Sequence, residues 1–345
     1  MISWLSILLR SRRIGALTVQ IPTSAAYALS VAAMITLSGC GGSSQIGSPA
    51  IGSNSAPNLK SGHSRKPPLV PYLFVSDLGT GPGNGVVQVF NYPNNTLAFT
   101  IGGFNVPGGE CVDGAGNVYI VDTANQVIQE YTNAGAFVHT LSDKGQNPVA
   151  CAVRQSPYRV AVANGASGSV SVYNGPVTTP TNIFSDLTKF TTVNFVGYHT
   201  GLPLRLYLDG NGMSGPFTFG RMSASGTFTV IPVSGGPAAP GGVQQPPGKL
   251  YLAVGDASSN LIYHIKTNGV LPASTLNNPN PTVLTGSCNT FGDFYIDLIA
   301  TTQRVVINPE TCLSVANEYK FPAGGPPGQQ YTSPLISPVG AVVSK

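Results

Sequence analysis

Charged residues are scarce in this chain of 345 residues, of which they make up only 9%. The 17 basic and 13 acidic side chains nearly balance, and the segment after Cys40 is close to neutral because Arg10, Arg12 and Arg13 precede it. A neutral segment lacks the basic patch that phosphate binding requires, so no nucleic-acid partner is expected. The hydrophobic content of 42% is too high for a disordered chain.

Histidine and tryptophan are rare as well, with four and one residues in the chain. In the part expected to fold, the histidines are His139, His199 and His264, and the single tryptophan, Trp4, lies near the N-terminus. A zinc site needs three or four ligands, and the positions expected for these histidines do not converge. The Gly-x-Ser-x-Gly motif of hydrolases is absent as well. The sequence therefore predicts no metal site and no catalytic residue.

The sequence also lacks an apolar run long enough to span a membrane, which would need ~20 apolar residues. The apolar stretch at 25–37 has thirteen positions and follows the basic segment 10–13, as in a signal peptide. The stretch ends at Leu37, and the sequence Leu37-Ser38-Gly39-Cys40 resembles the lipobox of bacterial lipoproteins. A plain signal peptide, or a short anchor helix with an incidental cysteine, stays open as an alternative.

The lipobox resemblance implies how the mature protein begins and where it resides. Residues 1–39 would be removed, and Cys40 would carry diacylglycerol and a palmitate-like acyl chain, with no other cofactor. The protein would then sit in the bacterial cell envelope, with the lipid bilayer as its partner, in the outer membrane or at the cell surface; a periplasm-facing position is also open. Residues 40–70 are rich in Gly, Ser and Pro, which predicts a flexible tether before a folded domain at 71–345.

The rest of the chain repeats one element, an apolar strand that ends in Asp or Asn. The spacings between successive ends are 45, 42, 45, 47 and 52 residues, and each strand is followed by a loop and a second strand. A period near 45 with about four short strands indicates an all-β, six-bladed β-propeller. The six strand ends are Asp77, Asp122, Asn164, Asp209, Asp256 and Asn308.

The first repeat, at 72–77, lacks the inner strand that precedes the Asp-ending strand in the other repeats. The C-terminal segment 334–344 has the same Pro-containing opening as the inner strands at 107–113 and 240–244. The C-terminal strand is therefore predicted to slot into the first blade, which closes the ring and removes two sheet edges.

Residues 107–141 resemble the NHL repeat, and residues 72–344 resemble uncharacterised bacterial propeller lipoproteins. The NHL class includes binding scaffolds and a few enzymes, so the resemblance does not decide the function. Because no catalytic constellation is found, we expect a monomeric, non-catalytic scaffold that binds a protein or small-molecule ligand at a propeller face, and a purely structural envelope protein stays open. The alternative is a metal-dependent hydrolase centred on the channel, of the SMP-30/gluconolactonase kind. The ligand asparagine of those lactonases is absent from the openings of the inner strands here.

Several polar residues are expected on or beside inner strands and are candidates for lining the channel. The six repeated Asp and Asn residues are instead predicted to be structural, accepting N–H groups in the turn after each strand. The channel candidates are Glu110, Asp113, Tyr198, His199, Asp293 and Asp297.

Four cysteines follow Cys40. Cys111 and Cys151 occupy equivalent positions on neighbouring inner strands, and facing sheets lie ~10 Å apart, so both are expected to be buried free thiols; a bridge between them near the crowded hub stays open. Cys288 and Cys312 fall in loops on the same face of the propeller. A Cys288–Cys312 disulfide is therefore feasible in an oxidising compartment.

Overall fold

The computed structural model shows only strands, turns and loops in the part of the chain that it describes. The predicted signal peptide, the lipobox with Cys40 and the tether up to residue 69 lie outside the described residues. No helix long and apolar enough to cross a membrane occurs among the described residues. These are residues 70–345 without 200–204, 214, 268–273, 277–279 and 289–291.

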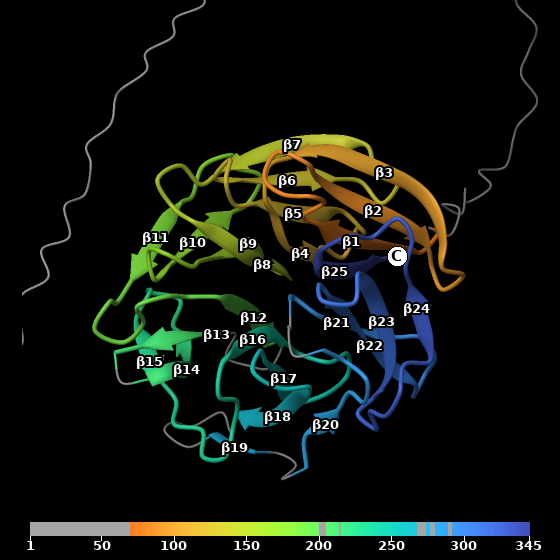
Figure 1. The fold of residues 1–345 in the computed structure, drawn as a ribbon. Coiled ribbons are helices and arrows are strands. Elements are labelled where there is room, and N and C mark those ends of the chain that lie inside the picture. The colour runs from red at the N-terminus through yellow and green to blue at the C-terminus, as the bar shows by residue number, and fades with distance from the viewer. Residues whose placement is uncertain (1–69, 200–204, 214, 268–273, 277–279, 289–291) are drawn as a thin grey trace, which may run out of the picture. The chain divides into compact units, whose positions relative to one another are not determined.

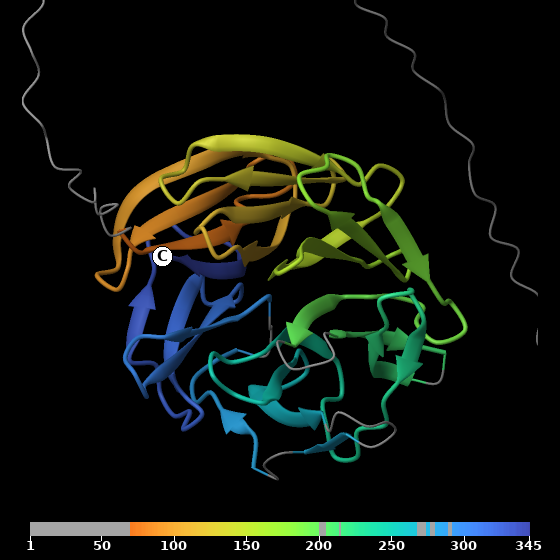
Figure 2. The same ribbon diagram turned by 180° about the vertical axis from the view of Figure 1, so that it is seen from behind.

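Six antiparallel sheets surround a common axis, which confirms the predicted six-bladed β-propeller (Figures 1 and 2). In each blade the first strand of the sheet lies innermost and the fourth lies outermost. Blade 1 contains β25 (Pro338–Ser344), β1 (Tyr72–Asp77), β2 (Gly85–Asn91) and β3 (Thr96–Phe104). Blade 2 contains β4 (Pro107–Val112), β5 (Val118–Asp122), β6 (Val127–Tyr131) and β7 (Phe137–Ser142). Blade 3 contains β8 (Pro148–Gln155), β9 (Tyr158–Asn164), β10 (Ser169–Asn174) and β11 (Asn182–Ser185).

The other three blades repeat this arrangement, with one extra short strand in blade 5. Blade 4 contains β12 (Phe195–His199), β13 (Arg205–Gly212), β14 (Gly215–Met222) and β15 (Phe228–Val230). Blade 5 contains β16 (Pro240–Gln244), β17 (Tyr251–Asp256), β18 (Leu261–Thr267) and β19 (Ser274–Leu276), and β20 (Thr282–Val283) also pairs with β18. Blade 6 contains β21 (Tyr295–Leu298), β22 (Arg304–Glu310), β23 (Val315–Phe321) and β24 (Gln329–Tyr331).

The burial of the strands follows their position in the blade. All five residues of β5 are buried because its two faces pack against the neighbouring blades, which explains why the second strands read as continuous apolar runs. The outermost strand β3 alternates instead between exposed and half-buried side chains over most of its length. The hydrophobic core is accordingly divided into clusters between adjacent blades.

The C-terminal strand closes the ring, as the sequence predicted. β25 pairs antiparallel with β1, from Tyr72 opposite Ser344 to Asp77 opposite Pro338. Figure 1 shows β25 between β1 and the hub of the ring. The carboxylate of Asp77 accepts hydrogen bonds from the backbone N–H groups of Ile336 and Ser337, both at 2.7 Å, which fixes the turn that leads into β25.

The repeated Asp and Asn residues are all buried and bind local groups, as expected for structural positions. Asp77 accepts the Gly79 N–H at 2.9 Å in the turn after its strand, as expected, but three carboxylates also hold the loop that enters an innermost strand. Asp122 accepts the N–H groups of Asn105 and Val106 at 3.2 Å, before β4. Asp256 also binds the turn that follows its own strand, where the Ser258 N–H donates at 3.0 Å. In three blades the repeated residue therefore holds the loop that leads into the innermost strand.

Candidate functional site

The hub of the propeller contains a cavity of about 710 Å³. It is lined mainly by the later halves of the innermost strands, including the end of β8, and by the loop at 245–250. The turn that follows β8 adds Ser156. We call the face of the ring that carries these loops face A, and the face where the second strands end in Asp or Asn face B. A volume of this size is typical of sites for small organic ligands.

The innermost strands close the hub toward face B. Their backbones come so close there that only glycine fits at two positions: a Cβ atom on Gly108 would lie 2.7 Å from the Val149 oxygen, and one on Gly340 would lie 2.6 Å from the Gly108 oxygen. Farther along the strands, toward face A, the same backbones spread and leave the cavity.

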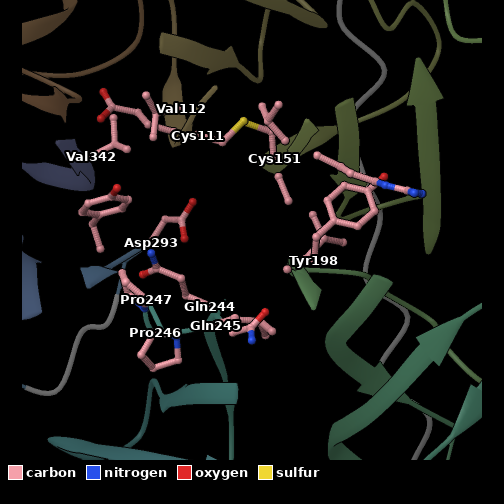
Figure 3. Close-up of a pocket in the computed structure, with 18 of the residues that line it drawn as sticks. Cys111, Val112, Cys151, Tyr198, Gln244, Gln245, Pro246, Pro247, Asp293 and Val342 are labelled. Carbon is pink, nitrogen blue, oxygen red and sulfur yellow. A yellow bond between two sulfur atoms is a disulfide. The ribbon is translucent and has the colours of Figure 1, made fainter. Parts of the chain in front are cut away.

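The same convergence explains a wrong prediction about Cys111 and Cys151. These residues were expected to be free thiols, but they form a disulfide between β4 and β8 with a Cα–Cα distance of 5.6 Å. The ~10 Å spacing of packed sheets applies to the middle of two blades, whereas their innermost strands approach one another at the axis. The disulfide lies in the cavity wall (Figure 3).

Two acidic side chains, Glu110 and Asp293, lie where the cavity narrows. Oε1 of Glu110 accepts a hydrogen bond from Oγ of Ser76 at 2.7 Å, and Oε2 is buried without a hydrogen-bond partner among the described residues. The carboxyl group of Asp293 packs against Gly109, where a Cβ atom would collide with Oδ2. Figure 3 shows this carboxyl group pointing toward the middle of the cavity.

Both carboxyl groups favour the protonated, uncharged form. Burial raises the pKa of Glu110 to about 8, and the nearby charge of Asp293 adds to this effect, while the bond from Ser76 opposes it. Burial likewise raises the pKa of Asp293 to about 8, against the lowering effect of the Glu110 backbone N–H. Near pH 7 the pair is therefore largely protonated and can donate hydrogen bonds.

Strand β25 supports Asp293 directly. The N–H of Asp293 donates to the Val339 oxygen at 2.9 Å, and the Ala341 N–H donates to the Asp293 oxygen at 3.1 Å. The side chain of Val342, also from β25, lines the cavity. Strand β25 therefore both closes the ring and forms part of the cavity wall.

The outer part of the cavity combines apolar and polar side chains. Tyr198, on β12, lines one side, and burial raises its pKa to about 12, so its hydroxyl stays protonated. Gln244 is fixed on another side because its Oε1 accepts the Ile296 N–H at 2.6 Å. Pro246 and Pro247 add rigid apolar surface (Figure 3).

Three of the six channel candidates, Glu110, Tyr198 and Asp293, line this cavity, and three do not. Asp113 binds its own turn, with Oδ1 at 2.8 Å from the N–H groups of Ala115 and Asn117. Asp297 is buried in an ion pair with Lys345, 2.6 Å away. His199 lies at the end of β12, where burial lowers its pKa and its ring packs 6.1 Å from that of Tyr207.

The cysteines Cys288 and Cys312 are joined by a disulfide, with a Cα–Cα distance of 6.4 Å. The bridge links the segment before β21 to the loop between β22 and β23 at face B. It lies outside the residues that line the cavity, so its role is to tie two loops of blade 6 together.

The described residues do not fit a metal centre. No group of three or more His, Cys, Asp or Glu side chains among them is placed to hold a metal ion. Glu110 and Asp293 supply carboxyl oxygens at the hub, but hard cations take six to eight oxygen ligands. The donor set of a metal-dependent lactonase is therefore not present in the part of the chain described.

Comparison with known proteins supports the fold and goes no further. No protein-family model matches the chain, and no curated protein matches its sequence. Among solved structures, a chain of a crystal structure of a nidogen/laminin complex is similar, with a TM-score of 0.59 and 12% sequence identity. The match covers 80% of this chain and 98% of that chain. At this identity the likeness shows the β-propeller fold alone.

Proposed function

We propose that this protein is an exported lipoprotein, anchored in the bacterial envelope through Cys40, whose propeller binds a small organic ligand without transforming it. The observation that carries the binding function is the cavity of about 710 Å³ at the hub. Its wall combines apolar surface with polar side chains, of which Glu110 and Gln244 are fixed by hydrogen bonds, as in sites that bind ligands by shape and hydrogen bonding. The lipobox resemblance at residues 37–40 supports the anchor.

A bound compound should travel with the protein when the full chain is purified from its own cell envelope. Unfolding the purified protein should release one organic compound per chain, detected by mass spectrometry. Val153 is half-buried in the cavity wall, so Val153→Trp should block the cavity and remove the compound. Val283→Trp, at an exposed site on β20, is the matched control and should retain it. Equal retention by both variants would contradict ligand binding at the hub.

The anchor has an independent test. The change Cys40→Ala removes the sulfur atom that would carry the lipid, and the variant should leave the membrane fraction and appear in the soluble fraction. Mass analysis of the unchanged protein should find an acylated, diacylglycerol-modified cysteine at its N-terminus. A membrane-bound Cys40→Ala variant would show that an uncleaved N-terminal segment is the anchor.

A further inference from the structure

Basic residues are distributed unevenly between the two faces of the propeller. Strand register places nine of the eleven described Lys and Arg residues at or near face A, and only Lys144 and Lys189 in loops of face B. The neutral overall composition conceals this separation. The nine residues are Arg154, Arg159, Arg205, Arg221, Lys249, Lys266, Arg304, Lys320 and Lys345.

Three acidic residues at face A are already engaged by local partners. Glu130 pairs with His139 at 3.0 Å, and Asp297 pairs with Lys345 at 2.6 Å. Asp113 accepts the N–H groups of its own turn. The remaining cations on this face are therefore not neutralised by these carboxylates.

Several of these cations surround the mouth of the cavity. Arg154 and Lys249 line it directly, from blades 3 and 5. Nε of Arg304 donates to the oxygen of Pro247 at 2.7 Å, which brings this guanidinium group against a residue of the cavity wall. Arg159 joins Arg154 and Tyr198 in a small adjoining cavity of about 60 Å³. Among the described residues, none of these four cations lies within ion-pair distance of an acid.

The inner end of the cavity, opposite the cationic mouth, contains acidic side chains that carry little charge. Glu110 and Asp293 lie there, and the buried Oε2 of Glu110 lacks a hydrogen-bond partner among the described residues. The acids that face this pair include Asp209, whose buried carboxyl group has a pKa raised well above its ordinary value by burial. Since all three groups favour the protonated form, the inner end carries little negative charge near pH 7 and does not repel an anion.

We propose that the ligand of the hub cavity is an organic anion, with its negative group held between Arg154 and Lys249 and its apolar body against Tyr198, Pro246 and Pro247. This inference rests on the proposed binding function and adds the chemical class of the ligand. Charged groups at a cavity mouth also raise the rate of encounter with oppositely charged ligands, so binding should weaken with added salt.

Two fluorescent probes with the same aromatic skeleton separate charge from hydrophobicity. Anilinonaphthalene sulfonate is an organic anion, and N-phenylnaphthylamine lacks its sulfonate group. Titration of the folded propeller, residues 70–345 with both disulfides intact, should show one saturable site for the sulfonate and about tenfold weaker binding of the neutral probe. The double variant Arg154→Gln, Lys249→Gln should weaken binding of the sulfonate by a similar factor and leave the neutral probe unchanged. Circular dichroism of this variant should match that of the unchanged domain.

The control variant removes two cations from face A that do not line the cavity. Lys266→Gln with Lys320→Gln changes the net charge equally and should alter sulfonate binding less than twofold. Equal binding of the two probes, lost together in Val153→Trp, would overturn the anion proposal but keep the binding function. Failure of both probes to bind would overturn both proposals.

Discussion

Removal of residues 334–345 should abolish the cooperative thermal unfolding of the propeller. The deletion takes away β25, which is the inner of the two strands that pair with β1. It also removes four buried apolar side chains, those of Leu335, Ala341, Val342 and Val343. Burial of a Val or Leu side chain contributes ~1.5–3 kcal/mol, so the total loss is on the order of 5–10 kcal/mol. That loss is comparable to the entire stability of a typical domain.

The deletion has a precise control and a possible rescue. Removal of Lys345 alone leaves the buried carboxyl group of Asp297 without its partner at 2.6 Å, so it should lower the melting temperature but keep the transition cooperative. A synthetic peptide of residues 334–345 should restore cooperative melting to the truncated domain, whereas the same peptide with Val342→Asp should not. Unchanged melting of the truncated domain, followed by circular dichroism, would show that the ring does not depend on this strand.

Stability should fall as the pH rises from about 5 to about 8, and Glu110→Gln should remove part of this fall. Burial raises the pKa of Glu110 from 4.5 to about 8 in the folded protein. The folded state therefore binds more protons than the unfolded state between these pH values. The stabilisation is complete below the unfolded pKa and is lost as the pH passes through the folded pKa. Burial raises the pKa values of Asp209 and Asp293 as well.

The glutamine variant keeps the acceptor for Ser76 and cannot ionise. Near pH 8 it should be more stable than the unchanged domain by on the order of 3 kcal/mol, which corresponds to a melting temperature higher by roughly 5–10 °C. Near pH 5 the two proteins should melt almost together. Asp186→Asn is the control, because Lys189 and Thr188 lower the pKa of this exposed carboxyl group and its variant should not flatten the fall. If the stability of Glu110→Gln fell with pH as steeply as that of the unchanged domain, Glu110 would already be ionised in the folded protein.

The order of strands could be predicted from the sequence because each repeat carries Asp or Asn at or near the end of its second strand. In three blades of the structure this residue makes the same kind of contact: Asp77, Asp122 and Asp256 accept N–H groups from the loop that enters an innermost strand. Ring closure could be predicted for a related reason: the strand at 72–77 lacked an inner neighbour, and residues 338–344 supply it.

The hub could be predicted only in part. Glu110, Tyr198 and Asp293 were recognised as channel candidates from their place on or beside inner strands, and they do meet in the cavity. The distances between neighbouring inner strands are not encoded in any local pattern. For this reason the sequence could not distinguish a Cys111–Cys151 disulfide from two thiols. The cations at the cavity mouth could not be predicted for the same reason, because Arg154, at the end of β8, and Lys249, in a loop, belong to different blades.

Hydrogen exchange at β25 tests most directly whether the C-terminal strand closes the ring and completes the cavity. In the closed ring the amides of Val342 and Ser344 belong to a strand paired along its length with β1, and the Ala341 amide is bonded to Asp293. These amides should exchange only through global unfolding, at the slow rate of the buried strand β5. Exchange of β25 within seconds, while β5 stays protected, would show a frayed C-terminus and contradict the account.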